Sequence, residues 1–381
     1  MIDTGILGEP LEIVPDISHQ ELAEFGGTTL EALRNAGARG RAVEQMRDFV
    51  KKKVTQLWAD GLVLGGIGLG GAEGAVMSAS ALMSLPFGVP KLVLSPIASG
   101  RHLFHPLVGT SDMMLMHTVV DILGLNQIAT AVFDNAAAAM AGMVQAKQDS
   151  PNSREPTRDV AITMLGNTTT STMAMREVLA AEGYQGVVFH ANGIGGPAME
   201  ELIQAGRFVG VIDLTISELV GDVMGGVHVG GDERLRSAAR LGLPQIVVPG
   251  CAEFAVFPPD SIPEKYKARP SYYHNPEFAL VRADLDEMLK VAELITDRIN
   301  GATGPTAVVI PTEGLSIPNR PGGEFYDPET DAIFTARLLE LLREDIPAFK
   351  EAMHVNDPEF GRVVARHFMK LVSAEAGVLH E

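Results

Sequence analysis

Short apolar runs rich in valine and isoleucine recur along the chain, and each is followed by glycine, proline or a polar residue. The runs cover residues 61–64, 91–94, 160–164, 186–190, 209–213, 245–249 and 306–311. Apolar runs of this length without polar alternation are typical of strands covered on both faces, as in a parallel sheet. They predict buried strands in both halves of the chain.

Helical patterns lie between these runs, with apolar residues at three- and four-residue spacing. They cover residues 29–35, 41–58, 173–182, 197–205, 233–241 and 283–300. Glycine follows several of them, at Gly37, Gly183 and Gly242, as is common where a helix ends. The regular succession of strand and helix indicates βαβ units. It predicts the α/β class, with mainly parallel sheets covered by helices.

A polar segment bracketed by prolines divides the chain. Residues 148–156 follow an alanine- and methionine-rich helix and include Pro151 and Pro156. Such composition is typical of a boundary between domains. We therefore expect a first domain at about 1–155 and a second at about 156–381.

Composition and charge exclude several classes of partner. The chain has 381 residues, 46% of them hydrophobic, which is enough for more than one core. Its 48 acidic and 30 basic residues give a net charge of −18, which argues against nucleic acid or an anionic membrane as the natural partner. Cys251 is the one cysteine, so no disulfide forms within the chain. No stretch has the pattern of a signal peptide or of a membrane-spanning segment. We therefore expect a cytoplasmic protein.

The first glycine-rich turn covers residues 65–74, between an apolar run and a helix. Backbone N–H groups in such a turn can hold a phosphate or carboxylate, with help from the helix dipole. The turn could equally serve to pack the helix closely on the strand. Glu73 counts against phosphate, because its carboxylate would repel the ligand.

The second glycine-rich turn runs from His190 to Pro197, again between strand and helix. It combines glycines with an imidazole and the carboxamide of Asn192, and no acid lies inside it. This composition favours a ligand site. His190 is a candidate for proton transfer, although it could simply end the strand as a satisfied polar residue.

A third turn, residues 165–172, is rich in hydroxyl groups and follows the apolar run at 160–164. Hydroxyls and the Asn167 amide at the entry of a helix can bind an anion. Helix capping is the alternative, but it needs only one of them. The surplus of hydroxyls favours a ligand.

Acidic residues follow several strand ends, and they are candidates for acid–base chemistry. They are Asp213, Glu218, Glu253 and Glu313. Carboxylates at such positions can have raised pKa values and transfer protons, but they also cap helices and hold ribose hydroxyls. Cys251 is more simply a bystander thiol than a nucleophile. His102 and His105 have a metal-like spacing, but no further ligand joins them, so no metal is expected.

Several segments, taken in order, resemble one family along nearly the whole chain. They are residues 2–10, 70–71, 88–91, 99–100, 108–112, 190–196, 211–215, 274–276, 321–328 and 356–358. Together they resemble the family named after the tomato mosaic virus resistance protein, the Tm-one-like ATP-binding family. The resemblance implies two Rossmann-like domains, self-association and binding of ATP in at least some relatives. ATP and Mg²⁺ are therefore the candidate cofactors of this chain. It implies no particular reaction.

The chain departs from this family at its start. The family usually opens with a strand bearing Gly-Thr-Leu-Asp-Thr-Lys and a helix, whereas this chain begins at the segment that follows them. The first strand and helix, on the order of 30 residues, are therefore expected to be missing. In a doubly wound sheet the first strand is central, so its loss should expose apolar faces. A misassigned start, a different closure of the sheet or a partner chain would each account for this.

The chain also departs from the family in the first glycine-rich turn. The family's Gly-Gly-Ser-Gly-Gly-Thr-Ser aligns with residues 70–76, where three hydroxyls are lost and Glu73 is gained. Arg101 stands where the family commonly has an acid. We hypothesise that Glu73 and Arg101 pair in the former phosphate space, which would remove ATP from the first domain.

The leading interpretation is a protein that binds a nucleotide-like or anionic metabolite between its two domains. The candidate ligand-binding residues are Gly70, Gly71, Gly74, Ser99, Gly100, Thr110, Ser111, Asp112, Gly166, Asn167, Thr168, Thr169, Asn192, Gly193, Gly195 and Gly196. One alternative is an enzyme acting on a small carboxylated or phosphorylated metabolite, in which His190, Asp213 or Glu218 moves protons. The other is a dimeric interaction protein with a degenerate nucleotide pocket. A homo-oligomer, with no nucleic acid and no membrane as partner, is expected in each case.

Overall fold

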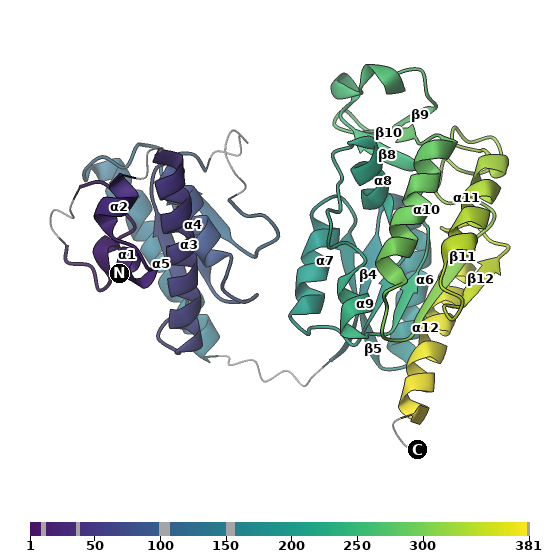
Figure 1. Ribbon diagram of the computed structural model, residues 1–381, viewed down its shortest axis with the longest axis horizontal. Helices are drawn as coiled ribbons and strands as arrows, with labels where there is room; N and C mark the ends of the chain where they lie inside the picture. Colours follow the sequence, from purple (N-terminus) through teal and green to yellow (C-terminus); the bar gives the residue numbers. More distant parts are fainter. Residues whose placement is uncertain (9–12, 36–38, 99–106, 150–156, 379–381) are drawn as a thin grey trace. The chain divides into compact units, whose positions relative to one another are not determined.

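The computed structural model describes the chain from residue 1 to 381, apart from residues 9–12, 36–38, 99–106, 150–156 and 379–381 (Figure 1). The chain forms two compact units, Met1–Arg154 and Glu155–Glu381. The predicted boundary at 148–156 falls mostly on residues outside the described ranges. Each unit has hydrophobic clusters of its own, and we describe the units separately.

The first unit has a three-stranded parallel sheet in the order β1-β2-β3. Its elements are α1 (His19–Phe25), α2 (Leu30–Arg34), α3 (Arg39–Ala59), β1 (Gly66–Leu69), α4 (Ala72–Leu82), β2 (Lys91–Ser95), β3 (Met114–His117) and α5 (Gln127–Asp149). Successive side chains of β2 point to opposite faces of the sheet. Val93 therefore packs with α4 and α3, whereas Leu92 and Leu94 pack with α5. The result is three layers, helix on sheet on helix.

Strand β1 lies a few residues later than the apolar run at 61–64 predicts. Helix α3 continues to Ala59, and Gly61 then takes a left-handed conformation with φ of 71°. The strand itself uses Gly66 and Gly68, because a Cβ at either position would lie 2.2 Å from a side-chain carbon of α4. Part of the first glycine-rich turn is thus a strand packed closely under a helix. No described strand pairs with the outer edge of β1, and Ile67 and Leu69 are about half exposed.

The second unit is built on a six-stranded parallel sheet in the order β12-β11-β7-β6-β4-β5. The strands are β4 (Arg158–Met164), β5 (Tyr184–His190), β6 (Gly210–Asp213), β7 (Gln245–Val247), β11 (Thr306–Pro311) and β12 (Ala348–Glu351). The helices are α6 (Thr169–Ala181), α7 (Gly195–Gln204), α8 (Ser217–Met224), α9 (Ser237–Leu241), α10 (Leu285–Ile299), α11 (Pro328–Leu341) and α12 (Pro358–Val378). The predicted α/β class with mainly parallel, helix-covered sheets is confirmed.

Helices cover both faces of this sheet. One face packs against α6 and α12, where Val160, Ile162 and Ile212 meet Phe360 and Phe368. The other face packs against α8, α10 and α11 through Val247, Val308 and Ile310, and against α7 and α9 through Ala161 and Val211. Because both faces are buried, the strands need apolar residues at consecutive positions, which is the pattern seen in the sequence.

A small antiparallel sheet stands beyond the main one, and the sequence pattern does not predict it. It has the order β8-β10-β9, from β8 (Phe254–Phe257), β9 (Ser271–Tyr273) and β10 (Ala279–Arg282). Figure 1 shows it at the top of the second unit, above the main sheet. None of the described helices combines the length and apolar character needed to span a membrane.

Candidate functional site

The carboxyl edge of the six-stranded sheet is where ligands bind in folds of this kind, usually where the strand order reverses. Here that point lies between β4 and β6. The structure fills it with protein groups: the Thr168 and Thr215 hydroxyls are 2.9 Å apart, and Thr163 Oγ1 lies 3.2 Å from Asp213 Oδ1. All four residues are buried. The polar groups at the reversal point therefore satisfy one another.

The polar groups of the hydroxyl-rich turn after β4 form hydrogen bonds within the protein. Thr168 Oγ1 accepts from Leu165 N, and Thr169 Oγ1 donates to the carbonyl of Gly166. Asn167 Oδ1 accepts from Ile317 N at 3.1 Å. Nearby, Thr170 N donates to Asn356 Oδ1 at 2.9 Å. The turn thus holds two segments, around 317 and 356, in place.

The second glycine-rich turn encloses a carboxylate that belongs to the protein. Gly193 N and Gly196 N both donate to Glu218 Oε1, at 2.7 and 3.2 Å. A Cβ at Gly196 would lie 1.9 Å from Glu218 Oε2, so glycine is needed there. Asn192 Oδ1 accepts from the N–H of Gly195 inside the same turn. The anion position of this turn is therefore occupied by Glu218.

Arg234 links the acids near this turn. Its fully buried guanidinium lies 2.6 Å from Asp213, 2.8 Å from Glu218 and 3.4 Å from Glu200. The three carboxylates keep its pKa above the usual value despite burial. Burial raises the pKa of Glu200, against the opposing effect of Arg234. Asp213 and Glu218, the predicted proton-transfer acids, are thus ion-paired to one buried cation.

His190 ends β5 and is exposed. Its neighbour His228 is half-buried, and its ring meets Phe278 at 5.4 Å between centroids. Burial, together with His190, lowers the pKa of His228 to about 4. The His228 imidazole is therefore neutral at neutral pH. A proton-transfer role for His190 stays a prediction.

In the first unit, the glycines of the first turn serve close packing. A Cβ at Gly70 would lie 2.7 Å from Gly74 Cα, and Gly71 is the N-cap of α4. Glu73 lies in the first turn of that helix and is exposed. Ser99, Gly100, Arg101, His102 and His105 fall outside the described residues, so the hypothesis of a Glu73–Arg101 pair stays a hypothesis.

Asp112 lies at the amino end of β2, away from the carboxyl ends of the strands. Its carboxylate accepts from Lys91 Nζ at 2.5 Å and from Gly88 N at 2.6 Å. Lys91 is almost completely buried, so this pair has a structural role. Thr110 and Ser111 precede it, and Ser111 lines a shallow cavity of about 770 Å³ together with Asp112.

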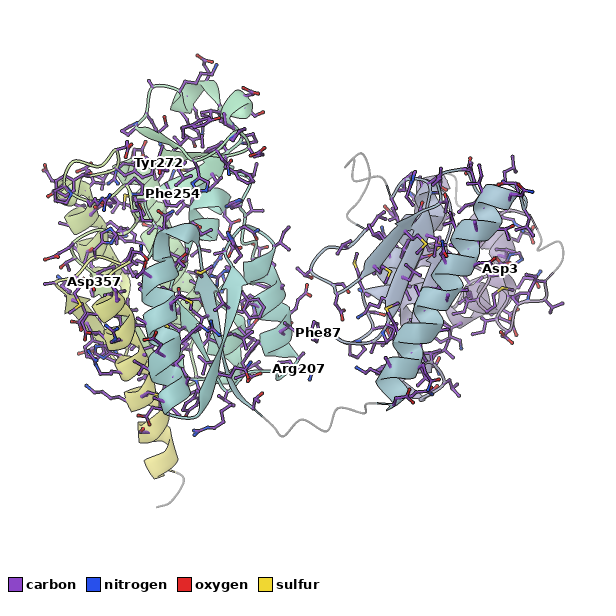
Figure 2. All side chains as sticks on the ribbon, turned by 180° about the vertical axis from the view of Figure 1, so that it is seen from behind. Asp3, Phe87, Arg207, Phe254, Tyr272 and Asp357 are labelled. Carbon is purple, nitrogen blue, oxygen red and sulfur yellow. The ribbon has the colours of Figure 1, made fainter. Side chains whose placement is uncertain are left out.

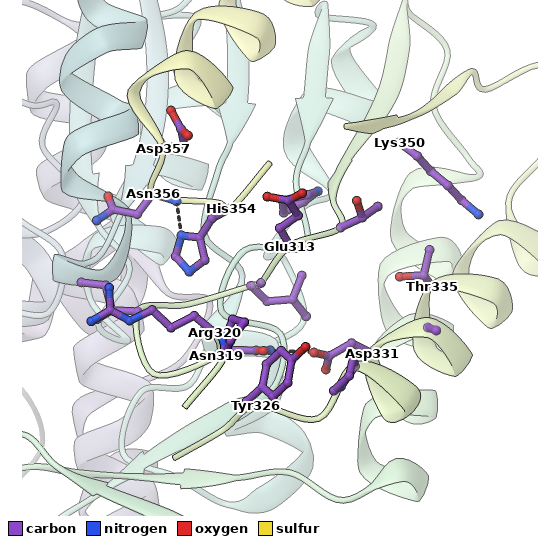
Figure 3. A pocket seen from close by; sticks show the side chains of 18 of the residues that line it. Glu313, Asn319, Arg320, Tyr326, Asp331, Thr335, Lys350, His354, Asn356 and Asp357 are labelled. Carbon is purple, nitrogen blue, oxygen red and sulfur yellow. Dashed lines mark hydrogen bonds between the residues drawn. The ribbon is translucent and has the colours of Figure 1, made fainter. Parts of the chain in front are cut away.

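The larger cavity lies in the second unit, at the carboxyl ends of β11 and β12, and its volume is about 800 Å³ (Figure 3). It is formed by the segment after β11, the start of α11 and the segment after β12. Its polar lining includes Glu313, Asn319, Arg320, Tyr326, Asp331, Thr335, Lys350, His354, Asn356 and Asp357. Of these, the strand-end argument finds only Glu313.

His354 is central to the pocket, and both of its ring nitrogens are occupied. Nε2 lies 2.8 Å from the carbonyl oxygen of Ser316 and must donate to it, while Nδ1 accepts from Asn356 N at 3.1 Å. The ring is therefore neutral, and burial lowers its pKa. A Cβ at Gly314, which has φ of 128°, would lie 1.9 Å from the Asn319 carbonyl oxygen and 2.7 Å from the ring. Only glycine allows this approach.

An ion pair forms part of the pocket wall. Asp331 accepts from Arg282 at 2.9 Å and from Asn319 Nδ2 at 2.8 Å. Arg282 also donates to the carbonyl of Phe325 at 2.6 Å. Burial raises the pKa of Asp331, and Arg282 opposes this effect. This wall is already satisfied within the protein.

Glu253 lies near this ion pair but has no bonded partner of its own. It is fully buried, and both carboxylate oxygens lack a hydrogen bond within the described residues. Burial raises its pKa to about 7, and the charge of Asp331 adds to the effect. Cys251, two residues earlier, is also buried, and its raised pKa keeps the thiol protonated.

Four side chains of the pocket have no such partners. Arg320, Lys350, Glu313 and Tyr326 are exposed, and none forms an ion pair or side-chain hydrogen bond with the rest of the described chain. Figure 3 shows Arg320 and Lys350 on opposite sides of the pocket. The pocket thus combines two unpaired cations with two carboxylates, Glu313 and Asp357, for which the described chain shows no cation partner. These cations were not predicted from the sequence, because neither lies in one of the predicted ligand-binding turns and neither is an acid at a strand end.

The architecture defines the second unit as an α/β fold with a parallel sheet covered by helices and a pocket at the carboxyl edge of that sheet. The chain belongs to the uncharacterised protein family UPF0261: the family's N-terminal domain matches residues 1–149 and its C-terminal domain matches residues 157–372. The predicted family resemblance is confirmed.

Relatives come from bacteria and from tomato. A UPF0261 protein of Clostridium tetani is 34% identical over 374 residues, covering 98% of this chain and 91% of the relative. A UPF0261 protein of Mesorhizobium japonicum is 34% identical over 367 residues, covering 96% and 90%. The ToMV resistance protein Tm-1(GCR237) of Solanum lycopersicum is 34% identical over 342 residues, which are 88% of this chain but only 45% of the tomato protein.

Proposed function

We propose that the second unit binds a small anionic metabolite in the pocket at the ends of β11 and β12. The observation that carries the proposal is the unpaired guanidinium of Arg320 on the pocket wall. The buried arginines of the same unit, Arg234, Arg282 and Arg298, each have a carboxylate partner. In a chain of net charge −18, an arginine that faces a cavity without a partner is matched to an anion from outside.

The surroundings of Arg320 support an anion. Because Asn356 Oδ1 accepts from Thr170 N, its amide group remains as a donor toward the pocket. Lys350 supplies a second cation.

Thermal shift tests this proposal on the full chain. The ligand panel is ATP and ADP with and without Mg²⁺, inorganic phosphate, and phosphorylated and carboxylated metabolites. A ligand at 100 times its Kd stabilises by about 2.7 kcal/mol, which a melting curve detects. We expect at least one anion to stabilise the wild-type protein, and Arg320→Gln to weaken its binding about tenfold or more, because a charged hydrogen bond is lost.

Arg207→Gln is the matched control. Arg207 is also exposed and unpaired within the described chain, but it precedes β6 at the opposite edge of the sheet, and Figure 2 shows it well away from Asp357 of the pocket. Equal losses in both variants, or no shift with any anion at millimolar concentration, would contradict the proposal. The second result would favour the interaction protein. A preference for ATP with Mg²⁺ would identify the nucleotide that the family resemblance implies.

We also propose a homodimer in the cytoplasm. The family resemblance supports self-association, and a single cysteine, which cannot form a disulfide within the chain, is typical of a reducing compartment. Sedimentation velocity decides the oligomeric state. A single monomer boundary at all concentrations would contradict the dimer.

A further inference from the structure

The pocket offers unpaired acceptors as well as unpaired donors. Arg320 and Lys350 can only donate hydrogen bonds, whereas the Glu313 carboxylate can only accept them. The hydroxyls of Tyr326 and Thr335 can do both. None of the five side chains has a hydrogen-bond or ionic partner in the described chain. A simple anion would bind the donors but offers no donor to the Glu313 carboxylate, which would then bind only water.

On the basis of the proposed anion site, we infer that the ligand is a polyhydroxylated anion, of the kind found in sugar acids and sugar phosphates. Its carboxylate or phosphate binds beside Arg320. Its hydroxyl groups bind at Glu313, Tyr326 and Thr335. Each hydroxyl both donates and accepts, so it matches a lining that contains both donors and acceptors.

An ammonium group in place of the hydroxyls matches fewer groups of the lining. It can donate to the Glu313 carboxylate, but it accepts no hydrogen bond, so it offers nothing to Arg320, Lys350 or the proton of the Tyr326 hydroxyl.

Tyr326 and the cavity size fit the same class of ligand. The Tyr326 residue is 47% exposed and lines the pocket, so its ring can cover the C–H groups of a sugar while its hydroxyl stays polar. The cavity of about 800 Å³ has room for a sugar-sized ligand.

Isothermal titration of the full chain tests the inference with matched six-carbon probes. Gluconate carries both the anion and the hydroxyls, hexanoate lacks the hydroxyls, 6-aminohexanoate replaces them by an ammonium group, and glucose lacks the anion. Ribose 5-phosphate and inorganic phosphate make the same comparison for a phosphate. We expect gluconate or ribose 5-phosphate to bind about tenfold or more tightly than its unhydroxylated counterpart, since two or more hydrogen bonds are lost.

Variants separate the two halves of the site. Tyr326→Phe should weaken the hydroxylated probe about fivefold and leave hexanoate or inorganic phosphate unchanged. Glu313→Gln removes a charge that repels anions, so it should strengthen the binding of hexanoate and inorganic phosphate and reduce the advantage of the hydroxylated probe over them. Arg320→Gln should weaken all anions, and Arg207→Gln none.

Two kinds of result would overturn the inference. If hexanoate or inorganic phosphate binds as tightly as its hydroxylated partner, and still depends on Arg320, the anion site stands but its specificity for hydroxyls does not. Preference for 6-aminohexanoate has the same meaning. If no probe binds, the anion site falls as well.

Discussion

Glu253 is a carboxyl group whose burial disfavours its charged form. It is fully buried, its oxygens have no hydrogen-bond partner in the described chain, and its pKa is raised to about 7. Burial is the main cause of this shift, the charge of Asp331 adds to it, and the charge of Arg282 opposes it. Since the folded protein holds this proton more tightly than the unfolded chain, ionisation destabilises the fold.

The sign of the pH dependence follows. Between the usual pKa of 4.5 and the folded value of about 7, the folded state binds more protons than the unfolded state. The contribution of Glu253 to the free energy of unfolding is therefore lost as pH rises through this range. Glu253→Gln removes the charge, so we expect it to be more stable than wild type at pH 8, by up to about 3 kcal/mol.

Urea unfolding of both proteins at pH 5, 6.5 and 8 measures this difference. The comparison cancels other titrating groups, such as His228 and His354, which are common to both proteins. A difference in stability that is the same at pH 5 and pH 8 would show that Glu253 does not titrate in this range.

At the scale of elements, Arg234 joins parts of the fold that are separate in sequence. Its partners come from α7 (Glu200), the end of β6 (Asp213) and α8 (Glu218), and Glu218 in turn holds the second glycine-rich turn. Glu200 also accepts from the N–H groups of Leu235 and Ser237. These contacts join α7, α8 and the end of β6 to the segment that precedes α9.

Arg234→Met should therefore destabilise the second unit by about 3–5 kcal/mol, because it leaves buried carboxylates without a cation. Arg236→Met is the matched control: that arginine pairs with Asp297 on the surface, so its loss should cost about 1 kcal/mol or less. Denaturant unfolding measures both. Arg234→Lys keeps the charge but loses the planar guanidinium that bonds several carboxylates at once, so its loss of stability should lie between those of the two methionine variants. Equal effects of Arg234→Met and Arg236→Met would refute a buried network.

At the scale of the whole molecule, each unit has its own core. Clusters from α1 to α4, around β1 and β2, and under α5 belong to the first unit, and the clusters on both faces of the six-stranded sheet belong to the second. A unit of more than 200 residues with its own buried core can fold alone.

We expect residues 157–381, expressed alone, to unfold cooperatively. We also expect this fragment to bind the anion found for the full chain, with a Kd within about threefold, because the pocket residues lie in this unit. Circular dichroism and calorimetry measure the two properties. A fragment that folds but has lost the ligand would show that the first unit contributes to the site.

The fold was largely predictable from local pattern. Strands β2, β4, β5, β6, β7 and β11 coincide with apolar runs, because strands covered on both faces need apolar residues at successive positions. Strand β1 begins later than the apolar run at 61–64 predicts. Its glycines are typical of a loop in sequence, and they form a strand here because α4 packs closely against them. The small sheet of β8, β9 and β10 was missed, since its strands have only three or four residues each and β8 pairs with β10 across a long intervening segment.

The sequence by itself determined the α/β class, because strands buried on both faces need runs of consecutive apolar residues. It also determined the family, through segments spread along nearly the whole chain, and the two-part plan, through the polar segment at 148–156. The role of each charged residue was decided only by tertiary structure. Arg234 and Arg320 both lie in segments rich in glycine or proline, yet packing surrounds the first with carboxylates and leaves the second facing a cavity. Glu218 and Glu253 both follow strands, but one meets an arginine and the other meets no partner in the described chain. Electrostatic energy depends on distance and burial, and neither is a property of sequence position.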